Sequence, residues 1–463
     1  MKKNWIYLLL MLAMMLPACK KILNIDRATD PTPTPVTVED FEQMLNSPEI
    51  CETPFYLIDE VTDDTYRDLG NTSGNFYTWA MDPWSRSEDP MFKNCYKWIV
   101  QMNLVINGMP KALPAGQMSD RRALAIAQAK INRAYFYLQL VNIYGKHYQV
   151  STAGIDLGVP LILQVNNQVS YPRASVAQVY QQILTDLREA LATAELPDTD
   201  KKNIIYPGKA AALALLARTY LYMGNYPQAE KAAADALAIK DKLLNYLGYK
   251  APGSNDGRLI TLVDQKKNDE VLLLRVNTVI GISNASFDYQ NLLYPSAELL
   301  ASFDQTNDKR YIASFKPQSF YSFGIINNDC SYNYSIGVPE IMLIKAECLA
   351  RANDAVGAVN LLNTLRAKRI VNYMSLPTNI TAEQALSLVL EERRRELMFK
   401  GLRLFDLKRL NLDPRFRKDI VRRDQNGKAL VTLPAGSPNY LIPFTKATLN
   451  ANPSLVQNPR VQL

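Results

Sequence analysis

Apolar residues recur at steps of three and four along most of this chain, which is the periodicity of helices that bury one face. The segment 122–144 keeps this pattern over its whole length. Ser175 with Gln178, and Thr381 with Gln384, have the spacing of a capping box, which marks the first turn of a helix. The pattern predicts helix pairs over about 92–144, 175–223, 226–240 with its partner, and 337–410.

Two of these stretches share a finer spacing of small and large residues. The matching positions are Ala217, Tyr220, Gly224, Tyr226, Ala229 and Ala236 in one stretch, and Ala346, Leu349, Asn353, Ala355, Ala358 and Leu365 in the other. Small residues let paired helices approach each other, and Gly or Asn accepts the turn between them. We therefore predict an all-α fold, in which tetratricopeptide-like helix pairs form a right-handed superhelical scaffold.

Two long segments, about 51–91 and 246–337, lack helical periodicity and are rich in aromatic residues, Gly, Pro, Asn and Asp. Long irregular insertions on a rigid scaffold commonly carry binding residues. We therefore expect a ligand-binding face in these loops.

The N-terminus has the pattern of an export signal. A basic start, 1–3, precedes the apolar segment 5–16, which is too short to span a bilayer as a helix. Ala18 stands directly before Cys19, the arrangement of a bacterial lipobox, in which the Cys thiol receives a diacylglycerol. The alternative is an ordinary secretory signal in which Cys19 has no role.

These observations divide the chain into three parts. Residues 1–18 are predicted to be a lipoprotein signal peptide, and residues 19–36 a lipidated tether. The tether is rich in Thr and Pro, a composition that favours a stiff, extended chain. Residues 37–463 are predicted to form a single domain, with its scaffold helices at about 92–144, 175–240 and 337–410.

Composition excludes several classes of site. His147 is the only histidine, so zinc motifs that need two His residues are impossible. The formal net charge of +7 is mild for 463 residues and gives no sign of nucleic-acid binding. No phosphate-binding glycine loop or EF-hand occurs, and we expect no cofactor or metal. The sequence leaves the disulfide state of Cys51, Cys95, Cys330 and Cys348 open.

An ordered set of motifs runs from Cys19 to the C-terminus. They are Phe92, Tyr96, Ile99, Asn103, 133–136, 144–145, 158–161, 179–180, 186–187, 217–221, 295–296, 298–299, 303–304, Asp308, Arg310, 392–394, 396–397, Phe399, Gly401, Arg403, 406–407, Arg409, 452–453 and 457–459. This set resembles the SusD/RagB family of outer-membrane lipoproteins from Bacteroidetes. The chain departs from the family pattern at Lys400, where Glu is frequent, and at Gly337, where Arg is frequent.

The resemblance implies both a function and a partner. Members of this family capture oligosaccharides, or in some cases peptides, without catalysis, and pass them to a TonB-dependent (SusC-like) transporter that they cover as a lid. The resemblance also implies a location at the outer membrane. We favour the cell surface. Lys20 and Lys21 follow the anchor where surface lipoproteins of this phylum often carry acids, and this departure leaves the periplasmic face as the alternative.

Sugar rings stack on flat aromatic side chains, while their hydroxyls need polar neighbours. Trp79 and Trp84 are therefore the leading candidates for ligand contact. The other candidates are Tyr66, Tyr77, Asn75 and Arg67 in the first irregular segment, and Tyr289, Asn291 and Tyr332 in the second. The alternative is that these rings fill the core beneath long loops.

Glu392 and Glu396 lie one helical turn apart, a spacing that permits the carboxylate pair of a glycosidase. Arginines surround both residues and should lower their pKa, which disfavours a general acid. We therefore expect an ion-pair network that joins this helix to the segment 403–409, with a left-handed turn at Gly401 between them.

Two alternatives to nutrient capture thus remain. One is this glycosidase, and the other is a tetratricopeptide scaffold that binds no small ligand.

Overall fold

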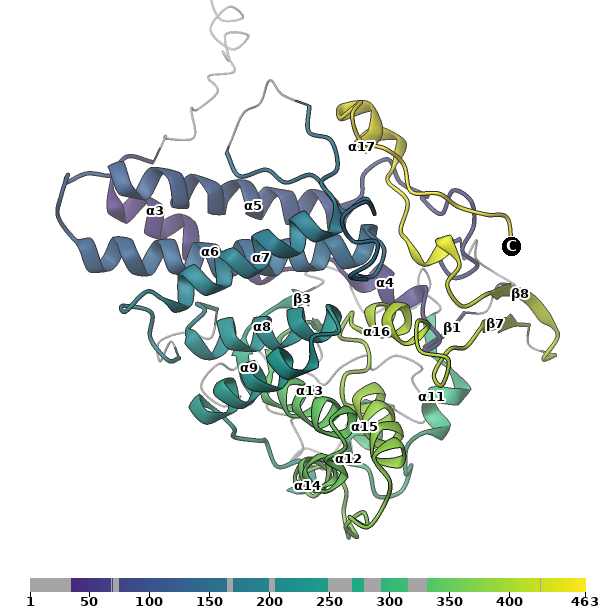
Figure 1. Cartoon of the computed structure of the whole chain (residues 1–463). Helices are drawn as coiled ribbons and strands as arrows, with labels where there is room; N and C mark the ends of the chain where they lie inside the picture. The colour runs from purple at the N-terminus through teal and green to yellow at the C-terminus, as the bar shows by residue number, and fades with distance from the viewer. Residues whose placement is uncertain are drawn as a thin grey trace, which may run out of the picture.

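The computed structural model describes residues 35–67, 69, 75–164, 170–199, 205–248, 269–278, 293–314, 331–424 and 426–463. The predicted signal peptide and Cys19 lie outside the described residues. Helices dominate the described part, as Figure 1 shows. None of these helices is both long and apolar enough to cross a membrane.

The first group of helices packs around α5 (Pro90–Gly108) and α6 (Ser119–Tyr144). Helix α3 (Val38–Leu45) lies against both and starts at Thr37, whose hydroxyl and the Asp40 carboxylate form a capping box. Helix α7 (Val176–Leu191) packs on α6, and the predicted capping box of Ser175 is present at its start. These helices form the upper part of the molecule in Figure 1.

The second group begins with α8 (Lys209–Tyr222) and α9 (Tyr226–Ile239), which pack together across a turn at Gly224, where φ is +71°. Helices α13 (Val338–Arg351) and α14 (Ala355–Arg366) repeat this arrangement around Asn353, with φ of +67°. Left-handed φ angles at both positions explain the Gly and Asn there. The tetratricopeptide-like spacing of the sequence is thus confirmed.

Helix α15 (Ala382–Glu396) packs on α13 and α14, and α16 (Arg403–Leu410) follows it. The predicted left-handed turn between them is present, because Gly401 has a φ of +65°. The shorter elements are α4 (Tyr56–Glu60), α11 (Ala297–Ala301), α12 (Lys309–Ser314), α17 (Lys446–Ala451) and 3-10 turns at Pro48–Cys51, Met109–Lys111, Tyr246–Gly248 and Pro438–Tyr440.

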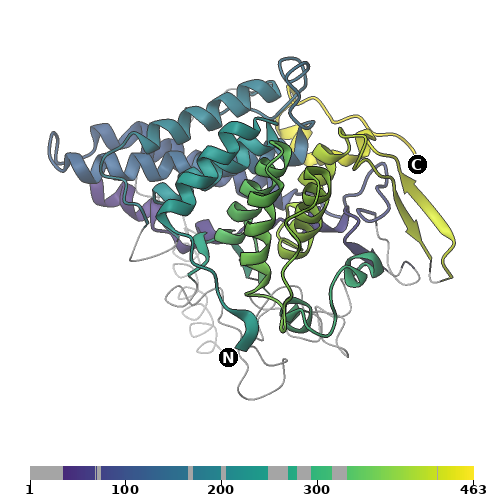
Figure 2. The ribbon, with the colours of Figure 1, turned by 60° about the horizontal axis from the view of Figure 1, so that its bottom comes forward.

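The described strands form four antiparallel two-stranded ribbons. They pair β1 (Thr65–Arg67) with β4 (Leu293–Pro295), β2 (Val271–Leu273) with β6 (Ile336–Gly337), β3 (Val276–Thr278) with β5 (Ser331–Asn333), and β7 (Ile420–Arg423) with β8 (Ala429–Leu433). Figure 2 shows the β7–β8 hairpin at the edge of the molecule. The segments 51–91 and 246–337, which the sequence predicts to be irregular, also carry short paired strands, because strands that pair over long distances leave no periodic pattern.

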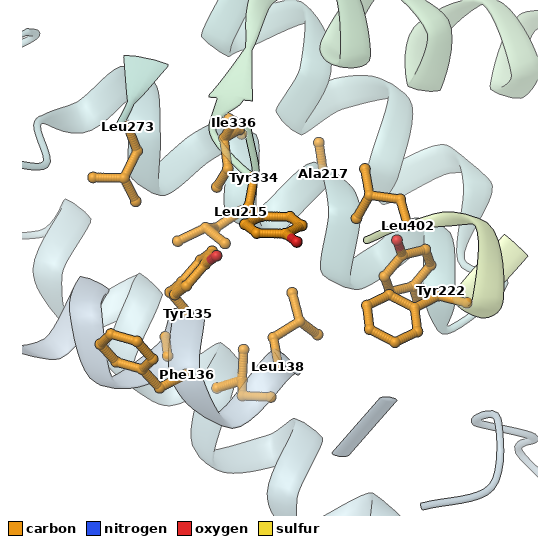
Figure 3. Close-up of a cluster of buried hydrophobic side chains, with 14 of the residues drawn as sticks. Tyr135, Phe136, Leu138, Leu215, Ala217, Tyr222, Leu273, Tyr334, Ile336 and Leu402 are labelled. Carbon is orange, nitrogen blue, oxygen red and sulfur yellow. The ribbon is translucent and has the colours of Figure 1, made fainter. Parts of the chain in front are cut away.

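One continuous hydrophobic core joins the two groups of helices. In Figure 3, Tyr135 of α6 points toward Leu215 of α8, with Ile336 of β6 close by, and Leu402 lies beside Tyr222 of α8. Cys51, Cys95 and Cys348 are buried and unbonded, and Cys330 lies outside the described residues.

Candidate functional site

Two half-buried tyrosines meet on the β1–β4 ribbon. Tyr66 of β1 stands directly opposite Tyr294 of β4, and their ring centroids lie 6.1 Å apart at a tilt of 46°. Strand side chains alternate between faces, and the neighbours Thr65 and Arg67 are buried on the other face. The structure therefore brings together aromatic residues from both loop segments that the sequence singled out.

Buried ion pairs hold this ribbon against the scaffold. Arg394 of α15 donates to the Asp64 carboxylate at 2.6 Å, and Arg403 of α16 donates to the Asp63 carboxylate at 2.8 Å. Ser296, next to β4, donates its hydroxyl to the Asp63 carbonyl and its N–H to the Asp64 carbonyl, both at 2.8 Å. The residues before β1 and after β4 are thereby fixed by the same network.

The two aspartates differ in their electrostatics. Burial alone would raise the pKa of Asp63, but Arg403, Arg394 and Lys418 outweigh it and hold this pKa well below its usual range. Burial raises the pKa of Asp64, and the adjacent Asp63 charge adds to that rise against the pull of the arginines. Because the Asp63 carboxylate and the Oδ1 atom of Asp64 bind these arginines, we assign both residues to positioning the ribbon.

Trp79 and Tyr77 were expected at the ligand surface, and the structure places both in the core. Trp79 is 2% exposed and donates its indole N–H to the Val61 carbonyl at 3.1 Å. The Arg422 guanidinium carbon lies 4.4 Å from the Trp79 ring centroid and 3.9 Å from that of Tyr77. Since an arginine covers both rings, we remove these two residues from the candidate site.

Arg67 is also removed from the candidate site, because it is buried and pairs with Glu60 at 2.9 Å. Trp84 is half-buried, donates to the Pro443 carbonyl at 2.8 Å and packs edge-on against Phe76, with centroids 4.9 Å apart. Part of the Trp84 surface thus remains accessible.

Asn75 is half-buried, and its carbonyl accepts from the Ala80 N–H at 2.9 Å. Tyr332 lies on β5 opposite Asn277 of β3, in a different ribbon from Tyr66. Tyr289 and Asn291 lie outside the described residues. The candidate site is therefore the Tyr66–Tyr294 pair, with Trp84 and Asn75 as further candidates.

The carboxylates considered for hydrolysis are fully engaged. One Arg310 nitrogen lies 2.6 Å from Glu392 and 2.7 Å from Glu396. Arg366 contacts Glu392 at 2.5 Å, and Arg369 contacts Glu396 at 2.9 Å. Although burial would raise their pKa values, these arginines hold the pKa of both carboxyl groups below its usual range. Neither group can therefore serve as a general acid near neutral pH.

The network differs in part from the one expected. Arg393 does join α15 to α16, through Asp406 at 2.9 Å. Glu392 pairs with Arg395 of its own helix, but also with Arg310 and Arg366, which precede it by 82 and 26 residues. Sequence spacing within one helix gives no signal for such distant partners.

His147 lies just after α6. Burial of its ring, together with the charges of Lys408 and Arg409, lowers the pKa of His147 to about 3. Its Nδ1 atom is buried without a hydrogen-bond partner among the described residues. The imidazole is therefore neutral at physiological pH, and no acid–histidine pair that could activate a serine is present in the described part of the chain.

Comparison with known proteins agrees with this fold. A family model described as "Starch-binding associating with outer membrane" matches residues 36–221, and the SusD family model matches residues 329–460. The SusD-like protein P2 of Formosa agariphila is 25% identical over 388 residues, which cover 72% of this chain and 73% of that protein.

Solved structures show the same architecture. A SusD superfamily protein from Bacteroides fragilis has a TM-score of 0.72 at 18% identity and covers 90% of this chain and 99% of its own. A SusD-like carbohydrate binding protein from Bacteroides vulgatus has a TM-score of 0.67 at 20% identity and covers 92% and 99%. With both family models in order along the sequence, the chain belongs to the SusD/RagB family.

Proposed function

We propose that this protein binds a glycan non-covalently at the outer membrane and delivers it to a TonB-dependent transporter. The observation that carries the proposal is the half-buried Tyr66–Tyr294 pair, which two loop segments form on a ribbon anchored to the scaffold. A relative that is named a carbohydrate binding protein and a family model that is described as starch-binding both support a glycan as the ligand.

The chemistry follows from the shape of the pair. The C–H face of a sugar ring stacks on an aromatic ring, and a phenol hydroxyl can bond a sugar hydroxyl. Two rings tilted by 46° offer neighbouring surfaces to adjacent sugar units of a chain. Binding of this kind breaks no bond, and its affinity should be modest because ordering the partners offsets much of the contact energy.

Attachment to the membrane is part of the proposal. A diacylglycerol on Cys19 and a further acyl chain would hold the protein on the bilayer, since each buried methylene contributes roughly 0.8 kcal/mol. The family model described as associating with the outer membrane supports this location. A transporter beside the protein would then receive the cargo directly.

Calorimetry with panels of oligosaccharides and peptides, using the soluble body from Thr37 onward, tests ligand binding. We expect Tyr66→Ala and Tyr294→Ala to weaken glycan binding without changing the melting temperature. Tyr171→Ala is the matched control, because Tyr171 is also a half-buried tyrosine but lies before α7. Equal affinity in all three variants would remove the pair from the site. A barrel that co-purifies while no ligand binds would favour the scaffold alternative.

A further inference from the structure

The loop that joins α5 to α6 presents aliphatic side chains to solvent. Leu113 is 50% exposed and Met118 is 37% exposed. Val36, at the start of the folded body, is 49% exposed. Two backbone hydrogen bonds hold the segments together, from Leu113 N–H to the Val36 carbonyl at 2.8 Å and from Val38 N–H to the Leu113 carbonyl at 3.0 Å. We call Val36, Leu113 and Met118 the entry patch.

A single arginine fixes the shape of this loop. Arg122 donates four hydrogen bonds, at 2.5 to 2.8 Å, to the carbonyls of Met109, Ala112, Pro114 and Gln117. Met118 has a left-handed φ of +57°, a conformation that persists only where the surrounding structure enforces it. The entry patch is therefore preorganised, and little ordering is needed for it to meet another surface.

The entry patch lies where the tether joins the fold. Residues 19–34 connect Cys19 to this point, and a chain of that length spans at most about 50 Å when it is extended. Covalent attachment to a surface keeps a nearby contact at a high effective concentration, so even a weak apolar patch can remain bound. Val36 is itself the last residue of the predicted tether.

The region around the entry patch carries almost no net charge, so it neither attracts nor repels a charged surface. The segments 35–42 and 109–122 contain three basic and four acidic residues, which nearly cancel. Arg121 pairs with Glu39 at 2.9 Å and with Glu42 at 2.5 Å. The entry patch should therefore bind another surface by burying its apolar side chains. Added salt should not weaken that binding, because it screens only charges.

We propose that the entry patch rests in the lipid surface beside the anchor of the protein, so that α5 and α6 present one end to the membrane. The proposal rests on the acylation of Cys19 that is part of the proposed function. The surface that covers the entry patch is the lipid bilayer, and the experiment must exclude a protein surface as the alternative.

Ile155 provides an internal control for the entry patch. Ile155 is 80% exposed and follows the C-terminal end of α6, whereas Met118 precedes its N-terminal end. Helix α6 has 26 residues, so the two ends lie about 39 Å apart. If exposed apolar surface alone drew the protein to lipid, Ile155 would enter the bilayer in preference to Leu113.

The experiment uses the full lipidated protein in phosphatidylcholine vesicles. Leu113→Cys and Ile155→Cys, each combined with Cys330→Ser, carry an environment-sensitive fluorophore, while the buried Cys51, Cys95 and Cys348 stay unlabelled. We expect a severalfold rise in emission at position 113, quenched by nitroxide-labelled lipid and insensitive to salt, and no change at position 155. Hydrogen exchange of the unsubstituted protein should slow over 113–118 when vesicles are present.

Mass spectrometry of the mature N-terminus separates the possible failures. An acylated Cys19 with no emission change at position 113, or with a change at position 155, overturns the entry patch alone. An unacylated N-terminus overturns both the anchor and the patch, while glycan binding by the soluble body stands independently. If emission at position 113 rises only when a co-purified barrel is present, the patch contacts protein and the proposal is wrong.

Discussion

The guanidinium carbon of Arg422 lies 4.4 Å from the centroid of the Trp79 ring. Arg422 also donates to the carbonyls of Glu60, Thr65 and Tyr77, at 3.0 to 3.1 Å. One buried arginine thereby ties β7 to the segments on either side of β1. Trp79, one of the two rings that looked most suited to stacking on sugar, instead stacks on this arginine in the interior, together with Tyr77.

Trp79→Ala should therefore act on stability. Loss of a large buried ring leaves a cavity, and we expect a decrease of about 3–5 kcal/mol in the free energy of unfolding. Trp84→Ala should cost less, because Trp84 is only half-buried. Urea denaturation of both variants checks the difference. A stable Trp79→Ala protein that binds glycan poorly would instead return Trp79 to the binding site.

Glu392→Gln should be far more damaging than the neighbouring Glu391→Gln. Glu392 pairs with Arg310, Arg366 and Arg395, and removing its charge leaves buried cations without a partner, at a cost of about 3–5 kcal/mol. The Glu391 side chain is largely exposed and reaches Arg395 only at 3.9 Å, so its loss should cost below about 0.5 kcal/mol. Thermal melts give both values, and similar losses in the two variants would contradict the network.

Acid should destabilise the protein partly through Asp406. Burial opposes its charge, but Arg393 and Arg409 lower the pKa of Asp406 to about 2. Because the folded pKa lies below the unfolded value of about 3.9, this carboxyl contributes stability above pH 4 that is lost as the pH falls toward 2. The stability gap between wild type and Asp406→Asn should therefore shrink by about 2 kcal/mol between pH 4 and pH 2. A gap that stays constant would show that Asp406 titrates normally.

Gly401→Ala should destabilise more than Gly427→Ala. Both residues have a left-handed φ, which costs an alanine about 1–2 kcal/mol. A Cβ at Gly401 would also lie 3.2 Å from side-chain atoms of Ile58 and Tyr334, whereas nothing lies within 4 Å at Gly427. The difference between the two melting temperatures measures this crowding. If the two variants are equally stable, the packing around the α15–α16 turn is looser than we infer.

The sequence predicted the scaffold well, because the long helices carry their own periodic patterns and several of them carry their own caps. The capping boxes of Ser175 and Thr381 and the left-handed turns at Gly224 and Asn353 are local features, and the structure confirms all four. Local chemistry of this kind is readable over a few residues.

The binding face was far less predictable, because its parts pair over long distances. Tyr66 and Tyr294 belong to three-residue strands, which are too short to show alternation. Whether a ring in a loop faces solvent or an arginine depends on segments hundreds of residues away, as Trp79 and Arg422 illustrate. Composition identified the two loop segments that meet at the Tyr66–Tyr294 pair, but it could not decide which of their rings face outward.

The anchoring of Asp63 by Arg403 joins positions 340 residues apart. A growing chain therefore cannot lock the Tyr66–Tyr294 ribbon in place until nearly all of the polypeptide has been made. A fragment that ends before α16 lacks Arg403 and with it this anchor of the ribbon.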